Sequence, residues 1–432
     1  MSGITRSDEE QQLLSRAASV FPGASMGNLR FGEDYSFIVR KGKGSRIWDV
    51  SGNEYVDYLL GSGPMVVGHA HPQVMAAAEQ AMRKGSTFFT QNEYSIELAE
   101  RIIEAMPCAE QVRYTSTGTE ATYYCLRVAR AYRKREKILK FEGGFHGMHD
   151  YSLMSLSPSG KVPFPVPEPS SAGIPTAVQD TVLIAPYNDI ETTAEIIERH
   201  HDELAAVIVE PVQRILEPLP GFLQDLRELT ARYDIPLIFD EVVTGFRLAY
   251  GGAQEYYGVT PDLAAVGKIV GGGFPLAAVV GRKDMMDIYD GSITGPDAFV
   301  PQVGTLNGNP VAAAAGLATL DIMSQPGTYE RYWANGATLR SSLQQMLNEA
   351  EIPATVSGID LMFDVYFTES KISDYRSTLT TDKSKNRLFD ETLMEHGIIK
   401  PPSKIYVGIC HDEADIAKTL VAFRAGIDAV RD

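Results

Sequence analysis

The sequence predicts an α/β fold in which a mostly parallel β-sheet forms the core of a large domain and a smaller α+β domain follows it. Between residues 112 and 266, short runs rich in Val, Ile and Leu alternate with segments of helical periodicity. Such alternation is typical of a parallel sheet with helices on both faces. The chain has 432 residues, and single cores seldom grow beyond ~250–300 residues. We therefore expect a second, smaller domain.

Residues 1–65 are expected to form an N-terminal segment that packs with the small domain. The pattern predicts an amphipathic helix over residues 8–20, followed by a loop. Three short strands are predicted after it, at 37–39, 46–50 and 55–59, with a hairpin turn between the last two at Ser51-Gly52-Asn53.

Residues 66–324 are expected to form the large domain, and residues 325–432 the small one. Helices are predicted over about 73–84, 94–106, 118–134, 192–200, 224–232 and 310–323. Strands are predicted at 112–115, 137–141, 182–185, 206–209, 237–240 and 263–266. Residues 157–175 carry six prolines and are expected to lie on the surface.

The composition is that of a soluble, acidic protein. Apolar residues make up 44% and charged residues 22% of the chain, which is ordinary for a globular protein. The formal net charge of −17 disfavours nucleic acid or an anionic membrane as the main partner. It still permits a local pocket for a phosphate.

Cysteine usage and hydropathy indicate a cytoplasmic protein. Cys108, Cys125 and Cys410 lie far apart without C-x-x-C spacing, so neither a disulfide framework nor a metal site is expected. The first residues are polar and acidic, unlike a secretory signal. No apolar run approaches the ~20 residues of a membrane span.

Ser116-Thr117-Gly118-Thr119 stands between a predicted strand and a predicted helix. Free backbone N–H groups and a hydroxyl at the positive end of a helix can bind a phosphate. The ordinary alternative is a helix N-cap without a ligand. The glycine spacing of a P-loop or a dinucleotide fingerprint is missing.

Two further segments place polar or aromatic side chains after strands. Phe145 and His146 follow the strand that ends near Phe141, and Glu210 and Gln213 follow the strand that ends near Val209. Ligands of open α/β sheets bind at the carboxyl ends of strands, so all four are candidate cofactor contacts. The alternatives are a core aromatic residue, a structural loop histidine and a solvated carboxylate.

Asp240 ends a wholly apolar strand, and Lys268 follows another apolar run shortly before Gly271-Gly272-Gly273. A buried carboxylate is costly unless a cation or several donors meet it. A protonated pyridine nitrogen is such a cation, and a lysine can hold an aldehyde as a Schiff base. The pair therefore predicts pyridoxal 5'-phosphate (PLP), whose ring accepts electrons from a carbanion. The alternative is an Asp–Lys salt bridge.

Four segments together resemble the signature of the class III (omega-type) PLP-dependent aminotransferases. They are DEVVTGFR from Asp240, PDL from Pro261, GKIVGGGFP from Gly267 and GTLNGNP from Gly304. Within that class the chain most resembles glutamate-1-semialdehyde 2,1-aminomutase and its aminotransferase relatives, over about residues 22–415. The resemblance implies fold type I and a homodimer.

The resemblance also implies roles for individual residues. Lys268 would be the Schiff-base lysine and catalytic base, and Asp240 the partner of the pyridine nitrogen. Val242 would pack beneath the ring and Phe145 above it. The phosphate would be bound by Gly118 and Thr119, together with Thr305 from the neighbouring subunit.

Substrate residues follow from the same resemblance and from departures from it. Arg30 falls where the aminomutase holds an arginine for the substrate carboxylate, which suits a guanidinium fork. Phe88 and Phe89 make their loop more apolar than its aminomutase counterpart, and Tyr406 stands at a glutamate position. Altered substrate residues beside an intact cofactor set favour an aminotransferase that exchanges an amino group between a small-molecule donor and a carbonyl acceptor.

Three alternatives stay open at this stage. The first is the aminomutase reaction itself. The second is a nucleotide-dependent oxidoreductase, disfavoured because no G-x-G-x-x-G opens a helix after a strand. The third is a non-catalytic PLP-binding protein, disfavoured by Lys268 and Asp240.

Overall fold

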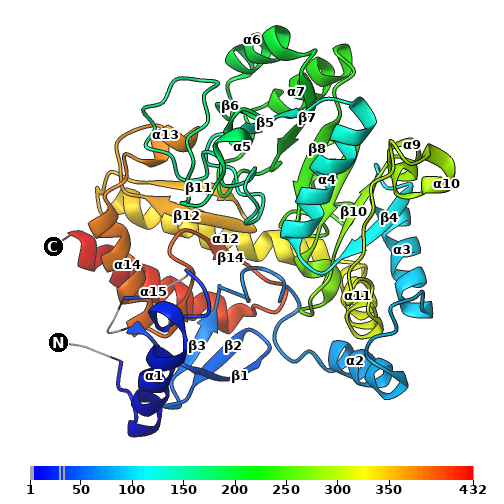
Figure 1. The fold of residues 1–432 in the computed structure, drawn as a ribbon. Helices are drawn as coiled ribbons and strands as arrows, with labels where there is room; N and C mark the ends of the chain where they lie inside the picture. Colours follow the sequence, from blue (N-terminus) through cyan, green and yellow to red (C-terminus); the bar gives the residue numbers. More distant parts are fainter. Residues whose placement is uncertain (1–3, 29–30, 33–34, 432) are drawn as a thin grey trace. The chain divides into compact units, whose positions relative to one another are not determined.

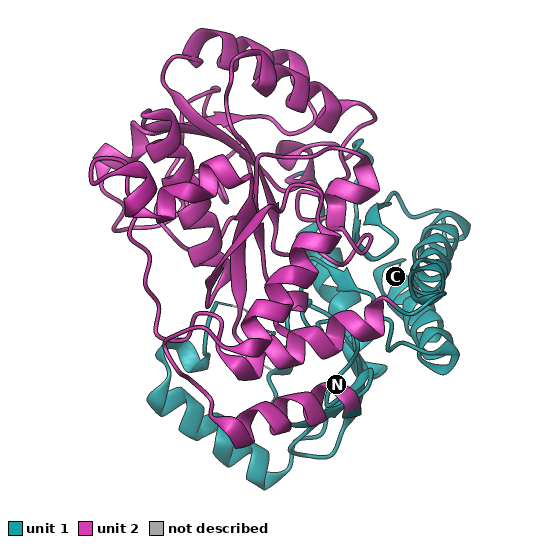
Figure 2. Cartoon of the chain, turned by 90° about the vertical axis from the view of Figure 1, so that its right-hand side faces the viewer, with its two compact units in different colours: residues 1–72, 325–371, 380–432 teal, residues 73–324, 372–379 magenta. Residues whose placement is uncertain are grey.

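A computed structural model describes residues 4–28, 31–32 and 35–431 of the chain (Figure 1). The chain divides into two compact units, coloured separately in Figure 2. The large unit comprises residues 73–324 and 372–379, and the small unit comprises residues 1–72, 325–371 and 380–432. The domain boundaries expected from the sequence stay a prediction.

The core of the large unit is a seven-stranded sheet within the described residues. Its strand order is β4 (Gln111–Thr115), β10 (Ala277–Gly281), β9 (Leu263–Val266), β8 (Leu237–Glu241), β7 (Leu204–Val209), β5 (Lys137–Phe141) and β6 (Val182–Ala185). Strands β5 to β9 pair in parallel, whereas β10 runs antiparallel to both of its neighbours. The predicted mostly parallel α/β fold is therefore confirmed.

Strand β10 was not expected from the sequence. Its run of Ala, Val and Gly is short and carries small side chains, so neither length nor periodicity separates it from a loop. Its place in the sheet comes from pairing with two strands. Strand β4 is distant in the sequence, and β9 precedes β10 across the turn that contains Lys268. Tertiary pairing, rather than local preference, makes it a strand.

Helices cover the sheet of the large unit. The longer helices of this part of the chain are α2 (Pro72–Lys84), which lies away from the sheet in Figure 1, and α3 (Glu93–Ala105), α4 (Gly118–Arg133), α6 (Ile190–His200), α7 (Phe222–Arg232) and α11 (Pro310–Met323). Helix α4 lies against β7, β9 and β10, and α6 contacts both β6 and α7.

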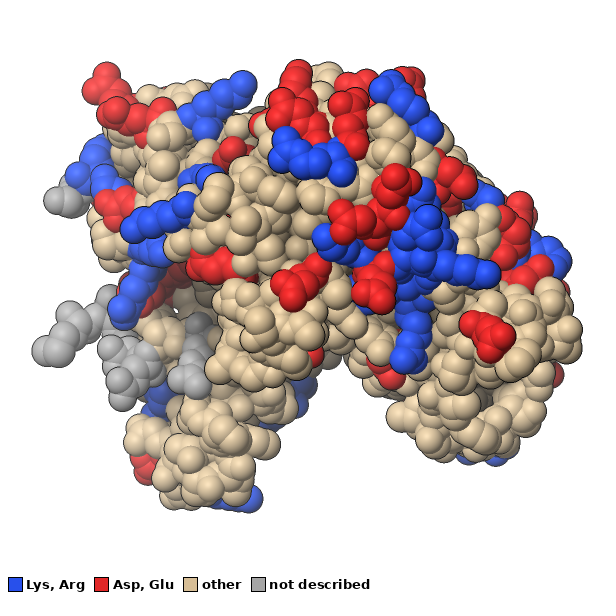
Figure 3. Space-filling view, turned by 45° about the horizontal axis from the view of Figure 1, so that its top comes forward, with Lys and Arg blue, Asp and Glu red and all other residues tan. Residues whose placement is uncertain are grey.

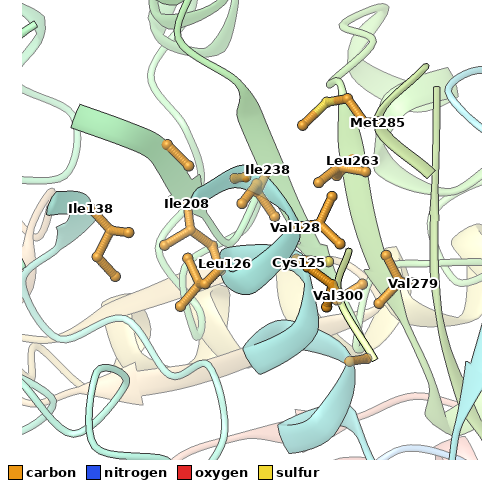
Figure 4. Close-up of a cluster of buried hydrophobic side chains, with 14 of the residues drawn as sticks. Cys125, Leu126, Val128, Ile138, Ile208, Ile238, Leu263, Val279, Met285 and Val300 are labelled. Atoms are coloured by element: carbon orange, nitrogen blue, oxygen red, sulfur yellow. The ribbon is translucent and has the colours of Figure 1, made fainter. Parts of the chain in front are cut away.

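A large apolar cluster lies between α4 and the sheet (Figure 4). Cys125, Leu126 and Val128 of α4 point toward apolar side chains from neighbouring strands, namely Ile138, Ile208, Ile238, Leu263 and Val279. Complete burial of an aliphatic side chain of this size contributes about 1.5–3 kcal/mol. This packing holds the N-terminus of α4 at the edge where the parallel strands end.

The described residues of the small unit form two smaller sheets. One has the order β1 (Val39–Lys43), β2 (Arg46–Asp49), β3 (Glu54–Asp57) and β13 (Ile398–Ile399); the other has β11 (Thr355–Ile359), β12 (Met362–Tyr366) and β14 (Ile405–Tyr406). Its longer helices are α1 (Asp8–Val20), α12 (Thr328–Glu349), α14 (Lys383–Glu395) and α15 (Glu413–Arg431). The expected β2–β3 hairpin is present, and β1 begins later than predicted.

The surface carries both signs of charge. On the face drawn in Figure 3, acidic and basic side chains are interspersed, which offers a polyanion no continuous basic stripe. Among the described helices, none is long and apolar enough to cross a membrane.

Candidate active site

The expected site residues follow the carboxyl ends of neighbouring parallel strands. Strand β5 precedes Phe145 and His146, β7 precedes Glu210 and Gln213, and β8 contains Asp240. Because β5, β7, β8 and β9 pair in parallel, these ends share one edge of the sheet, where ligands of α/β folds bind.

Asp240 and His146 form a buried hydrogen-bonded pair. Nδ1 of His146 lies 2.8 Å from Oδ2 of Asp240, and the Val242 N–H donates to the other oxygen at 3.1 Å. Burial raises the pKa of Asp240 to about 7, although the Val242 N–H and the charge of Lys268 lower it. Burial, reinforced by the charge of Lys140, lowers the pKa of His146 to about 3. Below about pH 7 the pair is therefore neutral, with a proton on the carboxyl between oxygen and nitrogen.

Lys140 anchors the loop that carries Phe145 and His146. This lysine of β5 is completely buried, and its Nζ donates to the carbonyl oxygens of Gly144, Ser152 and Met154 at 3.0, 3.0 and 2.6 Å. Burial lowers its pKa to about 7. This role was not predicted from the sequence, although a lysine between the apolar residues Leu139 and Phe141 of a strand indicates it.

Glu210 and Gln213 hold the same loop from the neighbouring strand. A carboxylate oxygen of Glu210 accepts from the Phe145 N–H at 2.9 Å. The amide Nε2 of Gln213 donates to the carbonyl oxygen of Glu142 at 2.8 Å. Both side chains are buried. These contacts position the Phe145–His146 segment; direct contact of Glu210 and Gln213 with a cofactor stays a prediction.

The N-terminus of α4 has the features of an anion-binding site. Thr117 and Glu120 make a reciprocal capping box, in which Oε2 of Glu120 accepts from the N–H groups of Ser116 and Thr117. The N–H groups of Gly118 and Thr119 donate to no residue in the described part of the chain. Two donors are thus available at the positive end of the helix dipole.

Asn307, whose role was not predicted from the sequence, contacts the residue that precedes the capping box of α4. The Ser116 hydroxyl donates to its side-chain oxygen at 3.2 Å. The contact spans 191 positions of the chain, so no local pattern of residues indicates it. It brings the loop that carries Thr305 beside the start of α4. Thr305 itself is exposed.

Val242 fills the space between the helix start and the lysine turn. A side chain at Gly118 would place its Cβ 2.8 Å from Val242, and one at Gly267 would come within 3.3 Å. Glycine at both positions therefore allows the end of β8, the N-terminus of α4 and Lys268 to approach one another closely.

Lys268 begins a short 3-10 turn in a left-handed conformation. Its φ is +50°, which is unusual for a residue with a side chain. Gly272 lets this turn pack on α11, since a Cβ there would lie 2.5 Å from the carbonyl oxygen of Ala315. The amine of Lys268 is partly exposed and makes no hydrogen bond or ion pair with the described residues, which leaves it available to a carbonyl carbon.

The expected substrate residues lie in three separate parts of the chain. Phe88 and Phe89 are 47% and 67% exposed on the loop before α3. Tyr406 is buried in the small unit, where it pairs with Met362 across β12 and β14. Arg30 lies outside the described residues. The roles of these four residues stay predictions.

The cluster fits PLP in its chemistry. It combines a buried carboxyl for a ring nitrogen (Asp240), an unpaired amine for an aldehyde (Lys268) and free backbone donors for a phosphate (Gly118 and Thr119). Within the described ranges there is no group of three or more His, Cys, Asp or Glu side chains that would hold a metal ion.

Comparisons with known proteins agree with this chemistry. The sequence profile of the family "Aminotransferase class-III" matches residues 31–403. The chain is 40% identical, over 96% of its length and 97% of the relative, to glutamate-1-semialdehyde 2,1-aminomutase of Methanosarcina acetivorans, and 41% identical, over 95% and 96%, to that of Desulfitobacterium hafniense. Among solved structures it resembles an omega-transaminase from Sphaerobacter thermophilus, with 36% identity, 98% coverage of both chains and a TM-score of 0.93.

Proposed function

The chain belongs to the class III aminotransferases, a PLP-dependent family of fold type I, and we propose that it moves an amino group at the site that contains Asp240 and Lys268. The observation that carries the proposal is the unpaired Lys268 amine whose charge acts on the buried Asp240 carboxyl. Bound PLP supplies an aldehyde and a ring that accepts electrons from the reacting carbon.

Cofactor binding and proton transfer are assigned to individual residues of the chain. Asp240 would hold a proton at the pyridine nitrogen, and its Oδ2 lies 2.8 Å from Nδ1 of His146. The Nζ of Lys268 takes the proton from the reacting carbon and returns it. The N–H groups of Gly118 and Thr119 would bind the phosphate, and Phe145 and Val242 would pack against the ring.

Two reactions are candidates. The names of the relatives at about 40% identity favour the aminomutase reaction, in which the amino group moves within glutamate-1-semialdehyde. This reverses the preference for an aminotransferase drawn from the sequence, and we propose the aminomutase reaction first. Transfer between two substrates is the second candidate, favoured by the likeness to the solved omega-transaminase. For either reaction, Arg30 is the proposed partner of a substrate carboxylate.

The activity test uses the purified protein saturated with PLP. Incubation with glutamate-1-semialdehyde and no amino acceptor gives the isomer if the aminomutase reaction is correct. Turnover of amines only with pyruvate or 2-oxoglutarate would instead establish the aminotransferase. Lys268→Ala is expected to lose either activity by more than about 100-fold. Absence of both reactions in a PLP-saturated protein would contradict the proposal.

The cofactor site is tested separately. Reduction with borohydride followed by digestion and mass spectrometry is expected to find the cofactor attached to the peptide that contains Lys268. Attachment at another lysine, or none after PLP addition, would overturn the assignment of Lys268.

A further inference from the structure

Arg214 lies at the tip of a tight turn beside the candidate active site. Two backbone hydrogen bonds close the turn: the Gln213 N–H donates to the Leu216 carbonyl at 3.0 Å, and the Leu216 N–H donates to the Gln213 carbonyl at 2.7 Å. Gln213, Ile215 and Leu216 are buried, whereas Arg214 is half-buried. The backbone around Arg214 is therefore fixed, and its side chain is the part of the turn that a ligand can reach.

The backbone of Arg214 is held in an unfavourable conformation. Its φ is +61°, in a region that residues with a side chain seldom adopt. Of the two central residues of the turn, only Arg214 has a positive φ, and glycine is the usual residue at such a first central position. A side chain that is kept at a strained position beside an active site indicates a function for that side chain.

The guanidinium of Arg214 faces the aromatic residue that is expected to pack on the cofactor ring. Its Cζ lies 5.2 Å from the centre of the Phe145 ring, and the Phe145 N–H donates to Glu210 at 2.9 Å. Burial and the charge of Lys140 lower the pKa of His146, and the charge of Arg214 adds to this effect. The positive charge of Arg214 therefore reaches the side chains at the edge of the sheet.

This guanidinium has no anionic partner in the described part of the chain. It makes neither an ion pair nor a hydrogen bond with the described residues, and its contact is with the Phe145 ring. By contrast, Arg376 donates to both carboxylate oxygens of Glu142, at 2.8 and 3.0 Å. None of the Arg214 nitrogens is among the fully buried unpaired atoms, so solvent reaches them. A planar guanidinium that is accessible and unpaired suits a carboxylate, which it meets through two hydrogen bonds.

We propose that Arg214 is a substrate-binding residue whose guanidinium pairs with a carboxylate of the substrate. The inference rests on the proposed function and adds to it, because it assigns a second cation, besides Arg30, to a substrate that is a carboxylic acid. The alternative is that Arg214 only stacks on Phe145. In that case its loss would destabilise the loop and would leave the affinity for carboxylates unchanged.

The test measures the binding of glutarate to the PLP-saturated protein by isothermal titration calorimetry. Glutarate carries two carboxylates but no amine, ketone or aldehyde, so it binds without reacting. In Arg214→Gln its Kd is expected to rise at least about tenfold, because charge-assisted hydrogen bonds are lost. The Kd of PLP for the cofactor-free protein is expected to stay the same. An equal loss of PLP affinity would assign Arg214 to the cofactor phosphate and would overturn the proposal.

Arg214→Gly separates ligand binding from a structural role. Glycine adopts the positive φ of this position without strain, so the midpoint of urea unfolding is expected to stay the same or rise. The Kd of glutarate is expected to rise as in Arg214→Gln. A lower unfolding midpoint together with an unchanged Kd would show that the side chain serves only to stack on Phe145.

Arg127→Gln is the matched control. Arg127 is exposed on α4 of the same unit, its Cζ lies 5.3 Å from the centre of the Tyr123 ring, and it too makes no ion pair with the described residues. Its replacement is expected to leave the Kd of glutarate unchanged. No binding of glutarate by the wild type, or the same Kd in Arg214→Gln, would overturn the proposal. Because glutarate is not turned over, failure of the proposed activity would not alter this result.

Discussion

At the residue scale, the chemistry of the site depends on how Asp240 and His146 share a proton without water. Both side chains are buried, so a separated carboxylate and imidazolium would each lose their hydration. Transfer of the proton between them removes both charges, which agrees with the raised pKa of Asp240 and the lowered pKa of His146. A ring nitrogen that carries a proton would restore a charged partner for Asp240.

This proton transfer predicts an unusual pH dependence of stability. Asp240 alone, with its pKa raised from 3.8 to about 7, favours the folded state below pH 4, and this advantage is lost as the pH rises toward 7. His146, with its pKa lowered from 6.5 to about 3, contributes stability that grows as the pH rises through the same range. The two effects cancel between about pH 4 and 6, because folded and unfolded pairs hold the same number of protons.

Replacement of His146 should reveal the effect of the Asp240 carboxyl on the pH dependence of stability. Cofactor-free His146→Gln is expected to lose up to about 1.4 kcal/mol of unfolding free energy per pH unit between pH 4.5 and 6.5, relative to the wild type. Urea unfolding across this range measures it. The double variant His146→Gln/Asp240→Asn should not show this additional decrease of the unfolding free energy with pH. Parallel pH profiles for the wild type and His146→Gln would contradict the neutral pair.

At the element scale, the site is built where loops after β5, β7 and β8 support one another. Lys140 holds the loop after β5 from below, and Glu210 and Gln213 hold it from the end of β7. The sequence predicted that residues after these strands meet at one edge, since strand alternation implies a parallel sheet. The sequence did not predict that Glu210 and Gln213 stabilise the loop after β5, because the Phe145–Glu210 contact spans 65 positions.

Lys140 offers a test of this support. Lys140→Met keeps much of the volume but leaves three carbonyl oxygens without their buried donor, so destabilisation by about 1–3 kcal/mol or more is expected. Amide exchange of residues 143–154 should accelerate more than that of the sheet, and PLP should bind less tightly. Hydrogen-exchange mass spectrometry measures both the loop and the sheet.

Lys137→Met is the matched control on the same strand. Lys137 pairs at 2.6 Å with Glu203, whose side chain is 48% exposed, and such surface pairs contribute at most about 1 kcal/mol. Equal effects of the two substitutions would show that Lys140 does not anchor the loop.

At the scale of the whole molecule, exposed apolar side chains concentrate in two stretches of the large unit. They are Phe88, Phe89, Ile96 and Ile103 in one stretch, and Ile293, Phe299, Val303 and Leu306 in the other. Contiguous exposed apolar surface commonly marks a protein interface. The second stretch contains Thr305, the residue proposed to reach the phosphate of a neighbouring subunit. We therefore propose a homodimer whose interface includes these stretches.

The dimer is tested by light scattering coupled to gel filtration, with an expected mass of twice 47.3 kDa. The substitution Val303→Glu places a charge on a side chain that is 75% exposed, and it should shift the protein toward monomer and lower its activity in proportion. Val421→Glu, at an exposed apolar residue of α15 in the small unit, should leave the mass unchanged. A monomeric wild type with full activity would refute the proposed interface.

The sequence by itself determined the features that arise within short stretches of chain. Alternating apolar runs and helical segments specified the mostly parallel sheet, and the signature around Asp240 and Lys268 identified the family and its PLP chemistry. Only the tertiary structure decided the pairing of β10, the roles of Lys140 and Asn307, and the direction in which Gln213 points. The physical reason is the same in each case: these features depend on side chains and strands far apart in the chain, whose contacts leave no periodicity or spacing in the sequence.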